Sequence, residues 1–289
     1  MNENELNLKD KLRDFYEHKK KETFLIGGSI LLILSILLVS IVKINSKEVL
    51  AFAKSRNAAL EGETITSMVY SGAEEMQKGP SKTYGKVVYL TIDDGPSEYT
   101  DEIIKILNKN NVKATFFVTN QFPKYEYLIK NEYEMGHVIG VHTYSHNYKK
   151  IYSSLENYID DVNKMNEIIK KYTGNFSNIL RFPGGSSNTI SRKYKRGIMT
   201  ELTREVSNLG YTYFDWNVAS GDVNGYSKNR IYKRIIKSLN DKPTIILMHD
   251  TKYNTLKVLP EIITYAKQNG YRFEVLSENS YNIHFKVSN

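Results

Sequence analysis

From about residue 85 onward the sequence alternates short apolar, β-rich runs with helical patterns, and this alternation limits the fold more than any other feature. Because a helical pattern or a long loop follows each run, consecutive runs are expected to form parallel strands joined by crossovers. Seven runs over roughly 200 residues predict an α/β fold, an irregular parallel barrel of seven or eight β/α units. The expected strands cover residues 87–91, 114–118, 138–141, 179–181, 211–214, 244–248 and 271–275.

The clearest helical patterns cover residues 100–110 and 155–171, where apolar residues recur at the spacing of one buried helix face. In a parallel barrel, reactive groups lie on the loops that follow the carboxyl ends of the strands. The residues just after each expected strand are therefore the first candidates for a functional site.

An uncharged, mostly apolar run of 19 residues, 24–42, precedes this region. Its length is close to the ~20 residues that a helix needs to cross a membrane, and we expect it to be a transmembrane anchor. A buried core helix would normally show a polar stripe, and this run shows none. A cleaved signal peptide is less favoured, because the small-residue sequence at 51–53 lies beyond several charged residues.

The expected organisation has four parts: a tail at 1–23, the anchor at 24–42, a polar stalk at 43–84 and a folded domain at 85–280. Six Lys and Arg residues precede the anchor and four lie in residues 43–62. This bias favours a cytoplasmic N-terminus. The chain is therefore expected to be a single-pass protein of the cell membrane with its folded domain outside the cell.

The sequence has no cysteine, which excludes disulfides, thiolate metal ligands and a cysteine nucleophile. Any metal must be bound by His, Asp or Glu. The formal net charge is +8, and a basic domain attracts anionic partners such as wall polymers or lipid head groups. The basic residues are scattered among acidic ones, so no nucleic acid partner is expected.

Ionisable side chains follow five of the seven expected strands, within the sequences DDGP, HTYSH, RFPGG, FDWN and LMHD. Each short sequence has a structural explanation when taken alone; DDGP, for example, forms a good turn. Their joint occurrence at strand ends predicts one functional site that includes Asp93, Asp94, His142, His146, Arg181, Asp215 and His249.

Two histidines and one carboxylate form a three-ligand metal shell, which leaves a coordination position for water as catalytic zinc sites do. His142 and His146 supply the two imidazoles, and the adjacent Asp93 and Asp94 supply the carboxylate. Neighbouring residues of a chain point in different directions. One aspartate can therefore bind the metal while the other faces the metal-bound water as a base. Zinc is the expected ion, although cobalt, manganese or nickel also suits such ligands.

The ordered sequences TIDDGP, HTYSH, RFPG, DW and LMHD resemble the five motifs of the NodB-homology polysaccharide deacetylases, over roughly residues 85–276. This resemblance implies an irregular barrel of seven or eight β/α units. It also implies metal-dependent removal of acetyl groups from N-acetylated sugars. By the same resemblance Asp94, His142 and His146 look like the metal ligands, Asp93 like the general base and His249 like the general acid.

The resemblance extends to residues around these groups. Asp215 is similar to the residue that pairs with the acid histidine, and Arg181 to the one that positions the base. The N–H of Gly184 is expected to stabilise the oxyanion, and Trp216 and Leu247 to form the walls of a small pocket for the acetyl methyl group. The family often carries an aromatic residue at the position of Gly184, so one side of the sugar groove is expected to be open here.

The expected function is metal-dependent hydrolysis of the N-acetyl group of N-acetylglucosamine in peptidoglycan or a related cell-surface polysaccharide. Alternatives on the same scaffold are an N-acetylmuramic acid deacetylase, a deacetylase of another surface polysaccharide and an O-acetyl esterase. From another class, the domain could bind wall polymer without turning it over, but the presence of both Asp93 and His249 argues against this. A phosphodiesterase is disfavoured because the motifs provide no ligands for a second ion.

Overall fold

The computed structural model describes residues 85–287 and 289. The predicted tail, membrane anchor and stalk lie outside these residues. Among the helices that are described, none is both long and apolar enough to span a bilayer.

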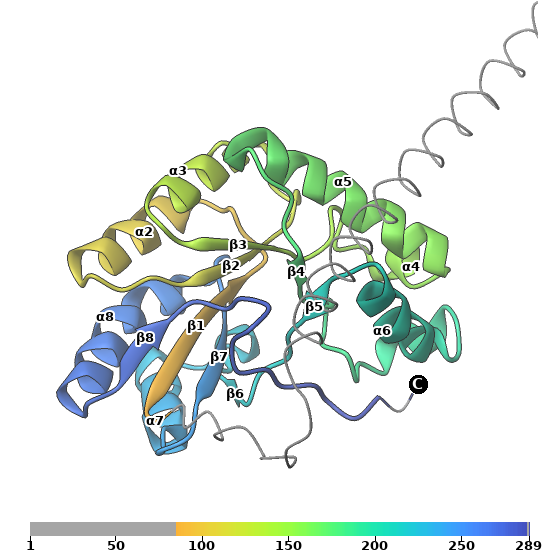
Figure 1. Ribbon diagram of the computed structural model, residues 1–289. Coiled ribbons are helices and arrows are strands. Elements are labelled where there is room, and N and C mark those ends of the chain that lie inside the picture. The colour runs from red at the N-terminus through yellow and green to blue at the C-terminus, as the bar shows by residue number, and fades with distance from the viewer. Residues whose placement is uncertain (1–84, 288) are drawn as a thin grey trace, which may run out of the picture. The chain divides into compact units, whose positions relative to one another are not determined.

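Eight parallel strands form one curved sheet in the described part of the chain (Figure 1). Its hydrogen-bonded order is β5-β4-β3-β2-β1-β7-β6, and β8 pairs with the first residues of β1. This order gives a half-barrel, and it confirms the predicted parallel α/β architecture. The strands are β1 (Val87–Asp93), β2 (Thr115–Val118), β3 (Val138–Val141), β4 (Ile179–Leu180), β5 (Thr212–Tyr213), β6 (Val218–Ala219), β7 (Thr244–His249) and β8 (Arg272–Glu274).

Each of the seven expected strands overlaps one of the observed strands. The strand that was not expected is β6, because its two residues are too few to show an alternation of apolar and polar side chains.

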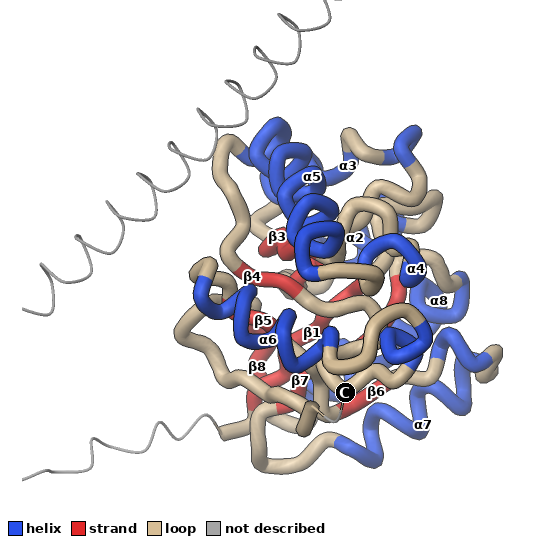
Figure 2. The backbone as a smooth tube through the Cα atoms, turned by 90° about the vertical axis from the view of Figure 1, so that its right-hand side faces the viewer, coloured by secondary structure: helices blue, strands red, loops and turns tan. Residues whose placement is uncertain are grey.

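Helices lie along the outside of the sheet in both views (Figures 1 and 2). The two helices predicted from sequence are confirmed as α2 and α5, with ends that differ by one or two residues. The helices are α2 (Thr100–Lys109), α3 (Leu128–Glu134), α4 (Tyr148–Ile151), α5 (Leu155–Thr173), α6 (Ile198–Asn208), α7 (Lys228–Ser238) and α8 (Tyr253–Gln268). Short 3-10 turns cover η1 (Pro123–Tyr125), η2 (Ile190–Lys193) and η3 (Asp222–Asn224).

Capping residues set both ends of the longest helix, α5. The Ser154 side chain accepts a hydrogen bond from the Asn157 N–H and so caps the first turn. The helix ends at Gly174, whose φ of 80° belongs to the left-handed region that glycine adopts without steric cost. Between these residues, one face carries buried side chains such as Val162 and Met165.

Strand β1 is buried on both faces along its whole length. Val88 and Leu90 face the helices and belong to the larger core cluster. Val87 and Tyr89 point the other way, into a smaller inner cluster with Phe117, Ile179, Phe214, Ile245 and Leu276. Because side chains alternate along a strand, Asp93 shares the inner face. The carboxyl end of β1 therefore presents an acid directly above the inner apolar cluster.

Candidate active site

Three predicted ligands converge at the carboxyl edge of the sheet. Asp94 follows β1, His142 follows β3, and His146 lies in the loop before α4. One ligand atom from each side chain lies within 4.8 Å of the other two. Asp94 Oδ1 is 3.5 Å from His142 Nε2 and 3.4 Å from His146 Nε2. The structure thus brings together the two imidazoles and one carboxylate that the sequence singled out.

The local contacts of this cluster fit a divalent cation. His142 Nδ1 lies 2.8 Å from the Arg181 carbonyl oxygen, so this nitrogen carries the proton and donates it, and the Nε2 lone pair faces Asp94. Burial, with a smaller effect of His146, lowers the pKa of His142 to about 3, which keeps its ring neutral. Asp94 Oδ1 is buried and accepts no hydrogen bond from the described residues. A buried carboxylate oxygen of this kind is costly unless a cation neutralises it.

The two adjacent aspartates face different groups. Asp94 adopts a φ of 75°, in the left-handed region, and this turns its side chain toward the histidines. Asp93 instead accepts a hydrogen bond from Arg181 Nη1 at 2.9 Å, and its Oδ2 lies 3.8 Å from His142 Nε2. Asp93 therefore lies beside the cluster without belonging to it, as expected of a base next to a metal.

Arg181 is fully buried and every part of its guanidinium is held. Nη1 donates to Asp93 and to the Thr91 hydroxyl at 2.6 Å, while Nε donates to the Phe214 carbonyl oxygen at 3.0 Å. The Phe117 ring lies 4.3 Å from the guanidinium carbon. A buried guanidinium with this many partners has one orientation, so it fixes the position of the Asp93 carboxylate.

His249 ends β7 and lies beside Asp93 in the register of β1 and β7. Its Nδ1 is 2.9 Å from Asp222 Oδ1, and its backbone N–H donates to Asp222 Oδ2 at 2.7 Å. The Thr255 hydroxyl donates to the same Oδ2 at 2.7 Å. Asp222 therefore orients the imidazole and leaves Nε2 of His249 as the nitrogen that can transfer a proton.

The predicted pairing of His249 with Asp215 is wrong. The Asp215 carboxylate accepts hydrogen bonds from the backbone N–H groups of Ser186 at 2.8 Å and Phe285 at 2.7 Å, and from the Ser186 hydroxyl. Strand order explains the error, because Asp215 follows β5 at one end of the sheet whereas β7 lies near the other end. Asp215 fixes the loop after β4 against the C-terminal segment.

Asp222 is the site residue that sequence reasoning missed. It follows β6, which pairs with β7 through Val218 with Ile246 and Ala219 with Leu247. Parallel neighbours end at the same edge, so the first acid after β6 must lie beside the end of β7. Asp222 stands in the sequence SGD shortly after residues 218–219. Its place in the site could be predicted only if those two residues were recognised as a strand.

The pKa is raised in both groups that would move protons, but for different reasons. Burial raises the pKa of Asp93, although the charges of Arg181 and His249 act against this. Burial alone would lower the pKa of His249, but the hydrogen bond and charge of Asp222, aided by Asp93 and Asp94, outweigh it and raise the pKa above 6.5. His249 is thus held in its protonated form over a wider pH range than a free histidine.

The remaining predicted residues border this site. Gly184 is exposed with a φ of 78°, in the loop after β4 whose Pro183 carbonyl accepts from the Tyr152 hydroxyl at 2.7 Å. Leu247 lies on β7 two residues before His249, and Trp216 packs against the inner cluster. Their roles toward an oxyanion and an acetyl methyl group stay predictions.

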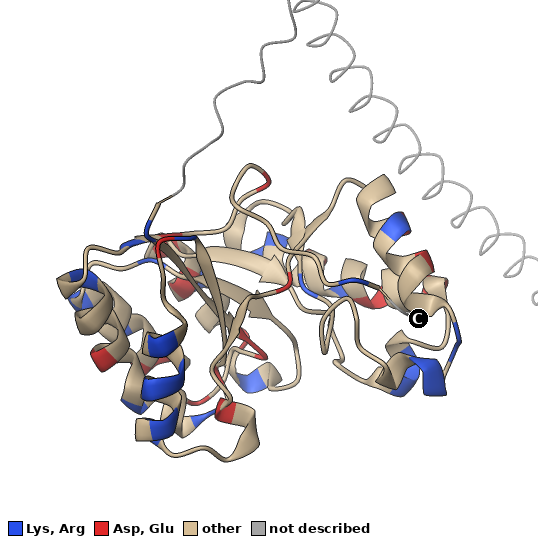
Figure 3. Cartoon of the chain, turned by 90° about the horizontal axis from the view of Figure 1, so that it is seen from below, with Lys and Arg blue, Asp and Glu red and all other residues tan. Residues whose placement is uncertain are grey.

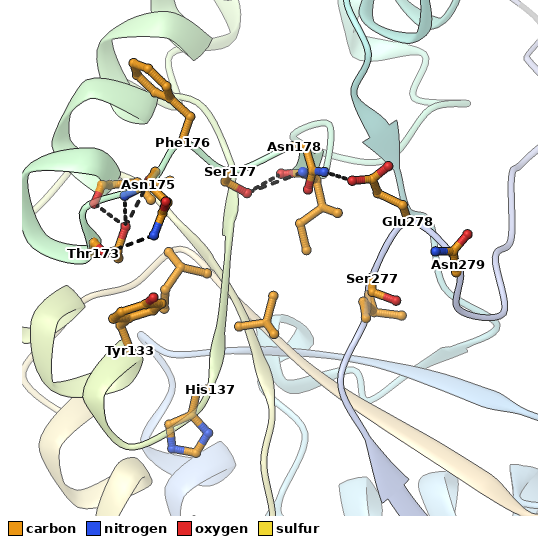
Figure 4. A pocket seen from close by; sticks show the side chains of 15 residues that line it. Tyr133, His137, Thr173, Asn175, Phe176, Ser177, Asn178, Ser277, Glu278 and Asn279 are labelled. Carbon is orange, nitrogen blue, oxygen red and sulfur yellow. Dashed lines mark hydrogen bonds between the residues drawn. The ribbon is translucent and has the colours of Figure 1, made fainter. Parts of the chain in front are cut away.

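A separate cavity of about 370 Å³ lies away from this chemistry (Figure 4). It is lined by the first residues of β3 and β4, at the edge opposite to the carboxylates and histidines described above. Tyr133, Phe176, Asn178 and Glu278 stand around its rim, and His137 lies below it (Figure 4). None of the predicted site residues lines this cavity.

The fold and the site define a parallel α/β protein with a cluster of two histidines and one carboxylate at the carboxyl edge of its sheet. A family model described as polysaccharide deacetylase matches residues 81–213. A peptidoglycan-N-acetylglucosamine deacetylase of Bacillus cereus is 32% identical over 229 residues, which cover 74% of this chain and 78% of the relative. A peptidoglycan-N-acetylmuramic acid deacetylase of Bacillus subtilis is 31% identical over 202 residues, covering 69% of this chain and 72% of the relative.

A solved structure indicates the same family. The catalytic domain of a peptidoglycan N-acetylglucosamine deacetylase from Eubacterium rectale superposes with a TM-score of 0.70 at 41% identity, covering 76% of this chain and 99% of that one. The chain belongs to the polysaccharide deacetylase family, as its motifs predicted, and it is a hydrolase of that family.

Proposed function

We propose that this chain hydrolyses the N-acetyl group of N-acetylglucosamine residues in peptidoglycan or a related cell-surface polysaccharide, with a divalent metal. The convergence of Asp93, the Asp94–His142–His146 cluster and the His249–Asp222 pair at one edge of the sheet carries the proposal. The relatives that are named as peptidoglycan deacetylases support the choice of substrate.

Asp94, His142 and His146 would hold the ion, for which zinc is our first choice given two imidazoles and one carboxylate. When bound there, a divalent ion polarises the amide carbonyl and lowers the pKa of a water molecule from 15.7 towards ~7. The remaining chemistry belongs to residues of this chain.

Asp93 accepts the proton of the attacking water, because Arg181 fixes its carboxylate beside the cluster. As water adds to the acetyl carbon, the carbonyl oxygen gains negative charge, and the N–H of Gly184 is the expected backbone donor to it. The C–N bond then breaks, and His249 donates its proton to the departing nitrogen. The products are acetate and a free amine on the sugar.

Acetate release from soluble N-acetylglucosamine oligomers and from peptidoglycan tests this proposal, with chelator treatment and metal add-back. Asp93→Asn should keep the metal and lose turnover by about 10²-fold or more, because the base is removed while the ligands remain. His146→Ala is the matched variant that should lose the metal as well. Unchanged turnover in Asp93→Asn would show that Asp93 is not the base. Full wild-type activity after metal removal would show that the reaction does not need the ion.

The same fold could instead act on N-acetylmuramic acid, on another surface polysaccharide or on O-acetyl esters. The similarity to a relative named as a peptidoglycan-N-acetylmuramic acid deacetylase supports N-acetylmuramic acid as the alternative substrate. Mass spectrometry of wall digests from cells with and without the protein separates them, since each predicts acetyl loss from a different position. Loss confined to muramic acid would replace N-acetylglucosamine as the substrate.

We also propose that residues 24–42 anchor the domain to the outer face of the cell membrane, with residues 1–23 in the cytoplasm. The uncharged apolar run of 19 residues and the Lys/Arg bias support this. Protease treatment of intact cells should then release an active fragment that begins in the stalk at 43–84. A fragment recovered only after cell lysis would contradict the orientation.

A further inference from the structure

Tyr148 lies where a side chain at position 184 would otherwise stand. A Cβ atom placed on Gly184 would be 2.8 Å from the Tyr148 hydroxyl oxygen and 3.6 Å from a carbon of the same ring. The Tyr148 hydroxyl therefore lies against the backbone of Gly184, the residue whose N–H is the expected oxyanion donor. The sequence predicted an open side of the groove at Gly184, and Tyr148 from α4 occupies the space where a side chain at this position would begin.

The Tyr148 ring is held in place by its neighbours. It is the first residue of α4, whose N-cap Asn147 accepts a hydrogen bond from the Lys150 N–H. The ring packs edge-on against His146 at 5.5 Å and against Tyr152 at 5.5 Å between ring centroids. Tyr152 in turn donates to the Pro183 carbonyl oxygen, so α4 and the loop that carries Gly184 are tied together.

The Tyr148 hydroxyl has a free hydrogen-bonding capacity at this position. It makes no hydrogen bond to any residue in the described part of the chain, whereas the hydroxyl of the next ring, Tyr152, is engaged. The Tyr148 ring contacts His146, one of the three residues of the Asp94–His142–His146 cluster. A donor that is fixed, unengaged and adjacent to the metal cluster is placed to meet the substrate.

We propose that the Tyr148 hydroxyl donates a hydrogen bond to the acetyl carbonyl oxygen of the substrate, next to the Gly184 N–H, and that its ring forms the groove wall at this side. The inference rests on the proposed function and adds a residue to it. A donor aimed at this oxygen binds more strongly as negative charge develops there, so it accelerates the chemical step more than it improves binding.

Tyr148→Phe removes the hydroxyl and keeps the ring. We expect kcat on soluble N-acetylglucosamine oligomers to fall by about 10²-fold, with KM changed less than about threefold, as for the loss of one oxyanion donor. Metal content and the melting temperature should stay at wild-type values. A purely structural role would instead move the melting temperature or KM and leave kcat in place.

Tyr158→Phe is the matched control, because Tyr158 belongs to the same run of packed rings and its buried hydroxyl has no partner among the described residues. Its turnover should equal that of the wild type. Wild-type kcat in Tyr148→Phe would overturn the inference while the proposed function stands. An inactive wild-type protein, fully loaded with metal, would overturn both.

The contact itself can be tested without activity by a double-mutant cycle. Gly184→Ala introduces the Cβ that meets the Tyr148 hydroxyl, and it also strains the backbone, since φ is 78°. The backbone strain is the same in both backgrounds and cancels. Gly184→Ala should therefore lower the melting temperature less in Tyr148→Phe than in the wild type. Equal losses would show that the hydroxyl does not occupy this space.

Discussion

Asp93 and Asp94 are neighbours in the chain but serve different groups. The left-handed backbone at Asp94 directs its carboxylate to the histidines, and Arg181 holds Asp93 beside them. In the proposed mechanism, one turn thus supplies both a metal ligand and a proton acceptor, and the backbone fixes the distance between them. This explains why two acids stand together at the end of a buried strand.

At the same scale, Asp222 controls the proton on His249. In the proposed mechanism His249 must be protonated to act as the acid, so activity should be present below its pKa and be lost as the pH rises through it. In Asp222→Asn the hydrogen bond to a charged group is weakened, and such bonds contribute about 1.5–3 kcal/mol. We expect the alkaline limb of the kcat/KM profile to move to lower pH by about one to two pH units.

Asp215→Asn is the control for this prediction. Asp215 makes its hydrogen bonds to Ser186 and Phe285 and has none to His249. The variant should lose stability but keep the wild-type position of the alkaline limb. A shift of the limb in Asp215→Asn, with none in Asp222→Asn, would restore the pairing that the sequence suggested.

At the scale of elements, α3 carries a carboxylate that weakens the fold as the pH rises. Glu132 is fully buried, and both of its oxygens lack hydrogen-bond partners among the described residues. Burial, together with the charge of Asp250, raises the pKa of Glu132 well above 4.5. The folded state therefore keeps the proton that the unfolded chain releases near pH 4.5. Stability falls above that pH, until the folded group also ionises.

The Glu132→Gln variant has no ionisable group at this position. The difference between its free energy of unfolding and that of the wild type should therefore increase as the pH rises from about 5 to 8. The slope is at most about 1.4 kcal/mol per pH unit for one proton. Denaturant midpoints of both proteins across this range measure it. Glu134→Gln, on the exposed side of the same helix, is the control and should show a constant difference. Parallel curves for Glu132→Gln would mean that Glu132 is already ionised in the fold.

At the scale of the whole molecule, positive charge is spread over many surface elements. Residues 85–289 contain 28 Lys and Arg and 21 Asp and Glu. Figure 3 shows Lys and Arg residues on several helices, with Asp and Glu residues among them. Such a distribution gives a general attraction to polyanions rather than one binding patch.

This excess charge predicts a salt dependence that differs between substrates. KM for an anionic wall polymer should rise several-fold between 0.05 and 0.5 M salt, because the Debye length falls below ~10 Å over this range. KM for neutral N-acetylglucosamine oligomers should change little, and this is the internal control. The measurement is acetate release at constant pH. An equal response of both substrates would assign the salt effect to the active site itself.

Much of the site could be predicted from sequence because its parts are local to strand ends. Asp94, His142 and His146 each lie within a few residues of a strand that the apolar pattern reveals, and parallel strands must end together. Asp222 could not be assigned, since its position depends on the pairing of a two-residue strand with β7. Tyr148 could not either, because its contact joins α4 to a loop 36 residues later in the chain.

The left-handed backbone of the site residues limits which substitutions can stabilise this protein without loss of activity. Asp94, Thr143 and His146 adopt φ values of 75°, 68° and 49°, a region where a side chain costs energy and glycine costs none. Glycine at 94 or 146 would relieve the backbone strain and would also remove a side chain that is proposed to bind the metal. Selection for thermal stability alone would therefore favour variants that have lost activity. A screen for stable variants of this protein must measure turnover as well as the melting temperature.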